Sequence, residues 1–506
     1  MGNNEDFIAQ ISKGYTTKGD YIYLGAGMLN GNVHSDASVK IPLKTMNRHG
    51  LIAGATGTGK SKTLQIIAEN LSDKGVPVML MDVKGDLSGI AKASEGAEFI
   101  DDRHKKLNFP FTPQDSPVEI LSLSDQEGIR LRATVSEFGP VLLSRILDLT
   151  STQTGILAII FKYCDDNHLP LLDLKDLKKI IQYSTEEGEA EFEKNYGRIP
   201  KASTGAILRK IVSLEQQGAD LFFGERSFEV NDLLRKNREG KGYINILRLT
   251  DIQDRPKLFS TFMLSLLAEI YSTFPEKGDM DKPELVMFID EAHLIFEEAS
   301  DALLDQIESI VKLIRSKGVG IYFVTQNPAD VPEEVLGQLG LKIQHALRAF
   351  TAKDRKAIKL AAENYPVSEF YDTKNMLTAL GIGEALVSAL DEKGRPSPLV
   401  ATMLRAPMSR MDILTDSELK DLIKSSDLVS KYNEELDRES AYEILNKKIE
   451  IADQEEAKEK AEKERKEVTN TSSSRRTKST EGAIIKVLTS ATFIRGVLGI
   501  LNKFLK

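Results

Sequence analysis

One eight-residue segment carries the residue types and the spacing that hold phosphate groups. Residues 54–61 read Gly-Ala-Thr-Gly-Thr-Gly-Lys-Ser, which matches the phosphate-loop pattern G-x-x-x-x-G-K-[ST] at every fixed position. In such a loop the backbone N–H groups surround the phosphates, the lysine reaches the β- and γ-phosphates, and the hydroxyl binds Mg²⁺. We therefore expect Lys60 to bind phosphate and Ser61 to bind magnesium. The expected nucleotide-binding residues are Gly54, Ala55, Thr56, Gly57, Thr58, Gly59, Lys60, Ser61 and Lys62.

The residues on either side of this loop predict the elements that would position it. His49–Ala53 is a short apolar run, which is typical of a buried strand. Within residues 61–71, apolar residues recur at 64, 67, 68 and 71, the spacing of one helix face. A strand, a glycine loop and a helix N-terminus form the arrangement that binds anions through backbone N–H groups. The sequence therefore predicts a protein that binds a nucleoside triphosphate.

A second apolar run ends in two carboxylates. Leu285–Ile289 is followed directly by Asp290 and Glu291. We expect Asp290 to hold Mg²⁺, directly or through water, and Glu291 to act as the general base on the attacking water. The alternative is a strand that merely ends in two solvated acids. The second carboxylate favours hydrolysis over kinase chemistry, and the lack of an Asn-Lys-x-Asp guanine-reading element favours ATP over GTP.

Other candidate catalytic residues follow the later strands. Gln326 directly follows the apolar run Val319–Thr325, and we expect it to orient the attacking water as a sensor. ATPases of this type often receive an arginine from a neighbouring subunit. Arg315, Arg348 and Arg355 are the candidates, although each is alternatively a surface charge. The expected catalytic residues are thus Glu291, Lys60, Gln326, Arg348 and Arg315.

Composition limits the class of protein. The 506 residues suffice for about three domains. The net charge of −9 does not favour DNA binding, although a ring or groove needs only a local basic surface. Cys164 is the single cysteine, which excludes an intrachain disulfide and a cysteine-based zinc site. We find no signal peptide and no apolar run of about 18 residues, and we expect a cytoplasmic protein without a transmembrane segment.

The order of strand and helix patterns predicts an α/β fold with a mainly parallel sheet, because the two kinds of element alternate. Helical periodicity without strand signals predicts an insertion. The expected parts are a small β-rich lead-in at 1–45, a RecA-like nucleotide-binding core at 46–124 and 236–411, a helical insertion at 125–235, a helical, charged and partly disordered linker at 412–481, and an apolar C-terminal helix at 482–506.

Several long strings make the chain resemble the HerA/FtsK superfamily of P-loop ATPases and, within it, the YjgR-like group of bacterial HerA-like proteins. The resemblance covers about residues 40–410. It rests on the strings Asn47–Ser61, Asp82–Gly89, Phe288–Leu294, Ile314–Pro328, Leu336–Gly340 and Gln344–Thr351.

This resemblance implies a RecA-like core that assembles as a ring, usually a hexamer. ATP would lie between subunits, and double-stranded DNA would pass through the pore. By motif position, Lys60 and Ser61 carry over as phosphate and Mg²⁺ ligands, Asp290 and Glu291 as the acidic pair, and Gln326 as the sensor. An alternative is an oligomeric ATP-dependent assembly or signalling protein that does not act on DNA. The acidic net charge and the lack of an obvious basic patch favour that alternative.

The C-terminal segment 482–506 is apolar and follows a charged stretch. A membrane-surface helix keeps its cations on one side. Lys486 and Arg495 would point in opposite directions on a helix, because each residue adds about 100° of rotation. We therefore expect this segment to dock on another subunit or a partner protein rather than on a membrane.

Overall fold

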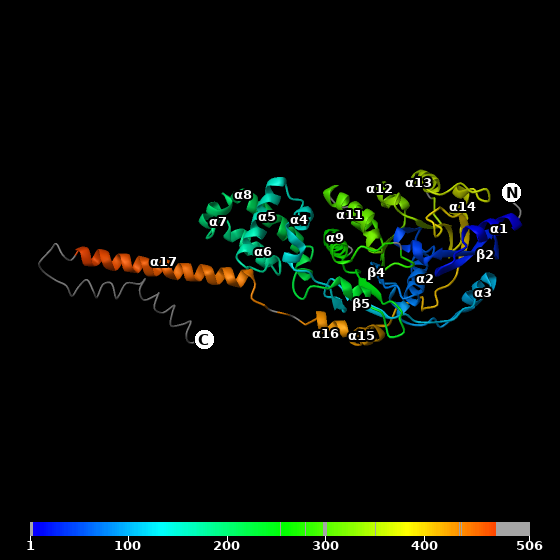
Figure 1. The fold of residues 1–506 in the computed structure, drawn as a ribbon, viewed down its shortest axis with the longest axis horizontal. Coiled ribbons are helices and arrows are strands. Elements are labelled where there is room, and N and C mark those ends of the chain that lie inside the picture. The colour runs from blue at the N-terminus through cyan, green and yellow to red at the C-terminus, as the bar shows by residue number, and fades with distance from the viewer. Residues whose placement is uncertain are drawn as a thin grey trace. The chain divides into compact units, whose positions relative to one another are not determined.

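The computed structural model describes residues 4–471, apart from 253, 254, 279, 297–300, 350, 435 and 437. The chain divides into two compact units, residues 1–442 and residues 443–506. The first unit holds the sheet and the helices around it (Figure 1). The described part of the second unit, residues 443–471, lies in the long helix α17 (Ala441–Thr471). No helix in the described ranges is long and apolar enough to cross a membrane.

A twelve-stranded sheet runs through the first unit in the order β2-β1-β12-β11-β10-β3-β9-β8-β4-β7-β5-β6. From β10 to β6 every pairing is parallel, whereas β11, β12, β1 and β2 are added in antiparallel fashion. This architecture confirms the predicted α/β fold with a mainly parallel sheet. The strands are β1 (Tyr21–Leu29), β2 (Asn32–Pro42), β3 (Gly50–Ala53), β4 (Val78–Asp82), β5 (Val118–Ser122), β6 (Ile129–Arg130), β7 (Ile244–Arg248), β8 (Leu285–Ile289), β9 (Val319–Thr325), β10 (Leu341–His345), β11 (Glu384–Ser388) and β12 (Val400–Leu404).

Helices cover the faces of the sheet, and a further group of helices lies beside it (Figure 1). Every residue of β3, β4, β8 and β9 is buried, which is expected of parallel strands with both faces covered. The helices before the long C-terminal one are α1 (Asn4–Gly14), α2 (Lys60–Asp73), α3 (Glu98–Leu107), α4 (Val135–Ile146), α5 (Ser151–Asp166), α6 (Leu174–Tyr183), α7 (Glu189–Tyr196), α8 (Lys201–Glu215), α9 (Pro256–Thr273), α10 (His293–Phe296), α11 (Asp301–Ile314), α12 (Glu333–Leu336), α13 (Ala352–Glu363), α14 (Thr373–Ala379), α15 (Asp416–Lys424) and α16 (Asp427–Tyr432).

The helices from α4 to α8 gather beside the sheet (Figure 1), and α4 also packs on α9. They lie in the range 125–235, for which the sequence predicts a helical insertion. That range also contains the short strand β6. Its first helix, α4, begins at Val135, directly after a capping box at Thr134. An aromatic stack of Tyr163 on Phe192, with ring centroids 4.3 Å apart, joins α5 to α7.

The N-terminal residues contain a helix in addition to the expected strands. They begin with α1, whose buried Phe7 and Ile11 face the adjoining strands. The two strands that follow join the main sheet, because β1 pairs with β12, with Gly25 opposite Leu404. Of the expected linker 412–481, the described residues form α15, α16 and α17, and the charged residues 453–467 lie in α17. Residues 472–481 and the expected C-terminal helix 482–506 lie outside the described residues.

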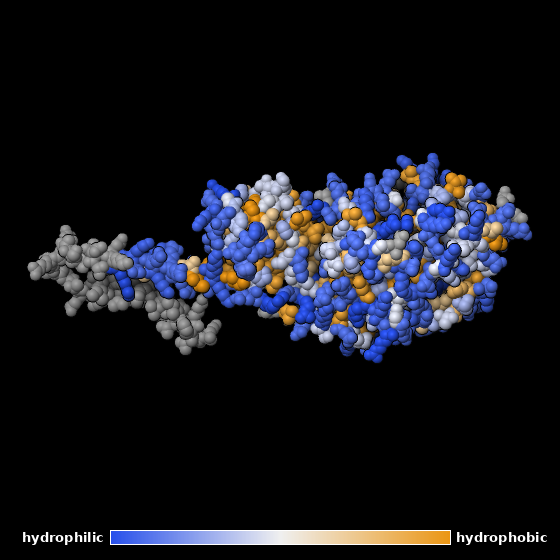
Figure 2. All heavy atoms as spheres, in the orientation of Figure 1, coloured by the Kyte–Doolittle hydropathy of each residue, from blue (hydrophilic) through white to orange (hydrophobic). Residues whose placement is uncertain are grey.

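The surface view shows hydrophilic residues over most of the visible face, with apolar residues scattered among them (Figure 2). Scattered single apolar residues are normal for a folded protein and indicate no particular site.

Candidate functional site

The loop between β3 and α2 has the backbone geometry of an anion site. Gly57 and Gly59 have φ angles of 76° and 113°, which glycine adopts without steric cost. No side chain caps the N-terminus of α2, so its first N–H groups are left to bind a ligand. The loop is tied to the sheet at its start, because Gly54 N donates to Thr325 O at 3.2 Å.

Lys60 lies inside this loop. Its side chain is buried, and its Nζ donates to Gly54 O at 2.7 Å and to Ala55 O at 3.2 Å. Burial and the nearby charge of Lys84 lower the pKa of Lys60. The ammonium group is therefore held at the loop, where phosphates bound by the backbone N–H groups would meet it.

The two carboxylates after β8 are buried and meet a lysine from the neighbouring strand's loop. Lys84, which follows β4, places its Nζ 2.5 Å from Glu291 Oε1 and 4.0 Å from Asp290 Oδ2. Burial raises the pKa of Asp290 to about 7, with Glu291 adding to the rise and Lys84 opposing it. Burial also acts to raise the pKa of Glu291, but the hydrogen bond and charge of Lys84 outweigh it and leave that pKa below its ordinary value.

The second oxygen of Glu291 has unused capacity to accept a hydrogen bond. Glu291 Oε2 is buried and accepts no hydrogen bond, although His293 Nδ1 lies 3.4 Å away. Glu291 also has a φ of 48°, in the left-handed region that non-glycine residues occupy at a cost. A buried carboxylate oxygen without a donor, held by a strained backbone, is the kind of group that takes part in function.

Gln326 is brought to the phosphate loop by the strand order. The strand β9 lies between β3 and β8, so the residue that follows it emerges between the loop and the carboxylates. Thr56 Oγ1 donates to Gln326 Oε1 at 3.4 Å. The structure thus places Lys60, Asp290, Glu291 and Gln326 at the C-terminal ends of the parallel strands, which form one edge of the sheet.

Residues at the end of β10 contact the phosphate loop and the helix that follows it. No sequence motif predicts these contacts. His345 is buried, its Nε2 lies 2.9 Å from Thr63 Oγ1, and its Cβ stands 2.5 Å from where a side chain on Gly54 would begin. Burial and the charge of Lys60 lower the pKa of His345 to about 4, so the ring is neutral near pH 7. Ala346 O accepts a hydrogen bond from Ala55 N at 2.9 Å. His345 lies in a string that carries the family resemblance, but no spacing rule connects it to the loop.

The loop that carries Lys84 is organised by Asp82. Its Oδ1 accepts from Gly85 N at 2.7 Å, and its Oδ2 accepts from Leu87 N at 3.2 Å. Burial and the charge of Asp86 raise the pKa of Asp82 to about 6, and the backbone hydrogen bonds oppose the rise. The sequence signal for this loop is the string of polar residues that leaves the end of β4.

The remaining candidates are spread more widely. Arg348 is exposed and follows β10 at the same sheet edge as the phosphate loop. Arg315 begins the short 3-10 helix η5 (Arg315–Lys317) before β9, so it lies at the opposite edge. Arg355 lies on α13. The side chain of Lys62 turns away from the loop, because its Nζ donates to Met411 O at 2.5 Å.

The oxygen groups present fit a magnesium ion that is bound together with a nucleotide. Ser61 offers a hydroxyl at the start of α2, and Asp290 offers a buried carboxylate after β8, at the same ends of the parallel strands. Within the described ranges, no group of three or more His, Cys, Asp or Glu side chains is arranged to hold a metal by itself. A magnesium ion here would therefore depend on the phosphates for its remaining ligands.

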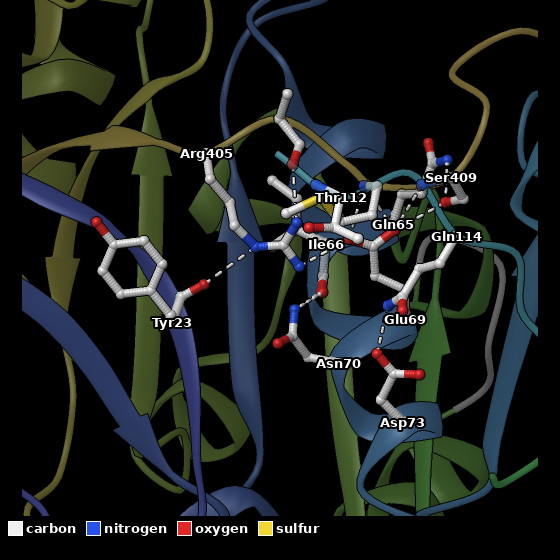
Figure 3. A network of polar contacts seen from close by, with 12 residues as sticks. Tyr23, Gln65, Ile66, Glu69, Asn70, Asp73, Thr112, Gln114, Arg405 and Ser409 are labelled. Carbon is white, nitrogen blue, oxygen red and sulfur yellow. Dashed lines mark hydrogen bonds and ion pairs between the residues drawn. The ribbon is translucent and has the colours of Figure 1, made fainter. Parts of the chain in front are cut away.

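A buried ion pair holds α2, and thereby the loop, to the rest of the unit (Figure 3). Arg405 Nη2 lies 2.7 Å from Glu69 Oε1, and both side chains are almost fully buried. Glu69 also accepts from Met408 N at 3.0 Å and from Ser409 Oγ at 2.8 Å. Arg405 Nε donates to Tyr23 O at 3.3 Å. The helix that presents the loop is thus bound to the residues after β12 and to β1.

The comparisons with known proteins agree with this geometry. The model of the family Helicase HerA-like C-terminal matches residues 28–495. The DNA double-strand break repair helicases HerA of Sulfurisphaera tokodaii and Sulfolobus acidocaldarius are 25% and 22% identical to the chain, over 70% of its length. The chain covers 65% of the length of each of these two relatives.

Among solved structures, the bacterial conjugative coupling protein TrwBdeltaN70, in its unbound monoclinic form, superposes with a TM-score of 0.51. It is 14% identical, and the match covers 80% of this chain and 94% of that one. This likeness shows that the two chains share a fold. Membership of the YjgR-like group stays a prediction. Because the family model spans most of the sequence, the chain belongs to the Helicase HerA-like C-terminal family.

Proposed function

We propose that this chain is an ATP-hydrolysing ring motor of the HerA/FtsK type that translocates or remodels double-stranded DNA. The observation that carries the proposal is the buried Glu291 Oε2, which accepts no hydrogen bond from the described residues and lies at the sheet edge of the phosphate loop. A loop that only binds nucleotide has no need for a buried carboxylate held ready beside it.

The known proteins lend support for the nucleotide and for DNA. Relatives that match most of this chain are named DNA double-strand break repair helicases. The coupling protein TrwB, which shares the fold, has been solved with a non-hydrolysable ATP analogue and with ADP and Mg²⁺. We extend both features to this chain, with ATP as substrate and magnesium as its cofactor.

In the proposed mechanism, the loop N–H groups and Lys60 bind the β- and γ-phosphates. Ser61 and Asp290 would hold Mg²⁺, which when bound offsets negative charge on the phosphates. Glu291 accepts a proton from the water that attacks the γ-phosphate, and Gln326 orients that water. His345 and Ala346 support the loop and keep it in position for these steps.

The ring is part of the proposal. We propose a homo-hexamer in which an arginine from one subunit reaches the nucleotide of the next. Arg348 is exposed at the same edge as the phosphate loop. Arg315 is exposed at the opposite edge, so it could act only if the neighbouring subunit's nucleotide lay against that edge. Mixing Lys60→Ala subunits with arginine-variant subunits tests the arrangement, because hybrid interfaces should recover part of the activity. Sedimentation that shows only monomers in the presence of ATP contradicts it.

We also propose that residues 482–506 dock on another subunit or a partner protein. Deleting them should weaken oligomerisation or partner binding and leave nucleotide binding intact. Strong liposome flotation of the intact protein that disappears on this deletion would contradict protein docking.

The central experiment measures ATP turnover with and without double-stranded DNA. We expect DNA to stimulate turnover in the wild type, and we expect Glu291→Gln to remain inactive in both conditions. If DNA does not change the rate of ATP turnover and no DNA binding is measurable, the DNA part of the proposal is wrong. That result would favour an ATP-dependent assembly or signalling protein.

A further inference from the structure

The fold gathers cations at the sheet edge opposite the phosphate loop. The segments before β3, β8 and β9 meet there, together with the turn that connects β11 to β12. A cavity of about 180 Å³ at this edge is lined by the cationic side chains of Lys44, Arg48, Arg315 and Lys393. Among its described lining residues Glu392 is the one carboxylate.

The charge of Glu392 is already bound by the N-terminal segment. Its Oε1 accepts from Lys18 N at 2.6 Å, from Gly19 N at 3.0 Å and from Thr17 Oγ1 at 2.8 Å. Those hydrogen bonds hold the carboxylate toward residues 17–19 and keep it charged. The cavity still carries an excess of positive charge, because its cationic lining residues outnumber this one carboxylate.

Arg48 lies against the turn between β11 and β12 at this cavity. Its Nη1 lies 2.8 Å from where a side chain on Gly394 would begin, and Gly394 has a φ of 76°. The absence of a side chain at Gly394 therefore lets the guanidinium rest against the β11–β12 turn. A guanidinium group can bind phosphate oxygens through two parallel hydrogen bonds.

A second cavity, of about 400 Å³, continues the row of cations. Lys236, Lys277 and Lys282 line it, and Met280 lines both cavities, so the two adjoin. Lys277 is paired with Glu284 at 3.3 Å, and Asp281 also lines this cavity. Even so, cations outnumber carboxylates along the two described linings. Arg315 is set apart, because it is a candidate for the arginine that reaches a neighbouring subunit. We name the other six cations of the two cavities the basic edge: Lys44, Arg48, Lys236, Lys277, Lys282 and Lys393.

We propose that the basic edge binds the phosphodiester backbone of double-stranded DNA. This inference rests on the proposed function, in which DNA is the substrate. An elongated row of cations fits a polymer with repeated phosphates, whereas a single small anion would need one cavity only. The edge is separated from the phosphate loop by the seven residues of β9, roughly 20 Å, so it cannot hold the phosphates of the same subunit's ATP.

A local basic surface is also what an acidic chain needs in order to bind DNA. The net charge of −9 repels DNA at long range. Cations from separate segments of the chain, gathered on one surface, overcome this repulsion at short range because salt screens distant charges.

The test compares two triple variants of the full chain. One is Lys44→Gln, Arg48→Gln and Lys393→Gln in the basic edge. The matched control is Lys175→Gln, Lys194→Gln and Arg198→Gln, three exposed cations among the helices α6 to α8. Both variants remove the same amount of positive charge. Fluorescence anisotropy measures the affinity for a double-stranded oligonucleotide over a series of salt concentrations, and a labelled ATP analogue measures nucleotide affinity.

We expect the basic-edge variant to bind DNA at least 10-fold more weakly than the control, with nucleotide affinity unchanged. The slope of log K against log salt should become shallower by about 0.9 for each DNA phosphate that the variant no longer neutralises. Equal DNA affinity and equal salt slopes in the two variants overturn the inference and leave the proposed function standing. A wild type that does not bind DNA overturns both.

One further outcome also decides against the inference. If ATP turnover falls in the basic-edge variant while its DNA affinity matches the control, these cations serve the nucleotide of another subunit and not DNA.

Discussion

Lys84 Nζ lies 2.5 Å from Glu291 Oε1, so a lysine from the loop after β4 holds the carboxylate that we assign as the base. This ion pair exists because β4 and β8 are neighbours in the sheet, although their residues are far apart in the sequence. Lys84 binds one oxygen of Glu291, and the other oxygen accepts no hydrogen bond from the part of the chain that the structure describes. Lys84 therefore positions the base and lowers the pKa of its carboxylate.

The first prediction concerns this pair. Lys84→Met should lower kcat about 10-fold or more, because the base loses the ion pair that orients it. The acidic limb of the kcat–pH profile should move to higher pH, because Lys84 lowers the pKa of Glu291. Steady-state kinetics between pH 5 and pH 8 measure both effects. Lys84→Arg serves as the control that keeps a cation. An unchanged pH profile in Lys84→Met would contradict this role.

The second prediction separates binding from chemistry. Glu291→Gln should bind ATP as the wild type does and turn it over about 10²-fold or more slowly, because the amide cannot accept the proton of the attacking water. Lys60→Ala should lose both binding and turnover, because the phosphate charge loses its partner. Equilibrium nucleotide binding and phosphate release measure the two quantities. Full turnover by Glu291→Gln would rule out the assigned base.

The third prediction concerns stability. Arg405→Met should lower the free energy of unfolding by about 3–5 kcal/mol, because it leaves Glu69 as an uncompensated buried charge. Urea denaturation at pH 7.5 measures the change. The matched control is Lys162→Met at the exposed ion pair with Asp166 on α5, which should change stability little. Comparable effects at the two sites would show that burial of the Glu69–Arg405 pair is unimportant.

The fourth prediction is a pH dependence. His49 is buried, and its Nδ1 accepts a hydrogen bond from Ile321 N at 3.0 Å, which requires an unprotonated nitrogen. Burial lowers the pKa of His49 from 6.5 to about 4. As the pH falls below 6.5, the unfolded chain gains a proton that the folded protein does not bind. The stability present above pH 6.5 is therefore lost progressively as the pH approaches 4.

At pH 5 this loss should amount to about 2 kcal/mol for His49 alone. Urea denaturation at pH 7.5 and pH 5 measures it, with His49→Asn as the comparison because the asparagine side chain has no group that titrates in this range. The variant should lose less stability than the wild type between the two pH values. An equal loss in both proteins would show that His49 does not titrate in this way.

The sequence predicted the parts of the site that depend on local pattern. The phosphate loop is contiguous, and its glycines and the following helix follow from backbone chemistry alone. Strand-length apolar runs located β3, β8 and β9, and the residues that leave their C-terminal ends included Asp290, Glu291 and Gln326. The α/β class followed from the alternation of these runs with helical patterns. By contrast, α1, β5 and β6 were not predicted, because short elements carry weak periodicity.

Contacts between distant segments were decided by the tertiary structure. Lys84 reaches Glu291, and His345 lies beneath the phosphate loop, only because of which strands are neighbours. The Glu69–Arg405 pair and the basic edge likewise join residues hundreds of positions apart. The sequence showed no basic patch, since its cations are dispersed along an acidic chain. Local periodicity states which residues face the core, but strand order is set by the packing of the whole sheet, and that order decides which side chains meet.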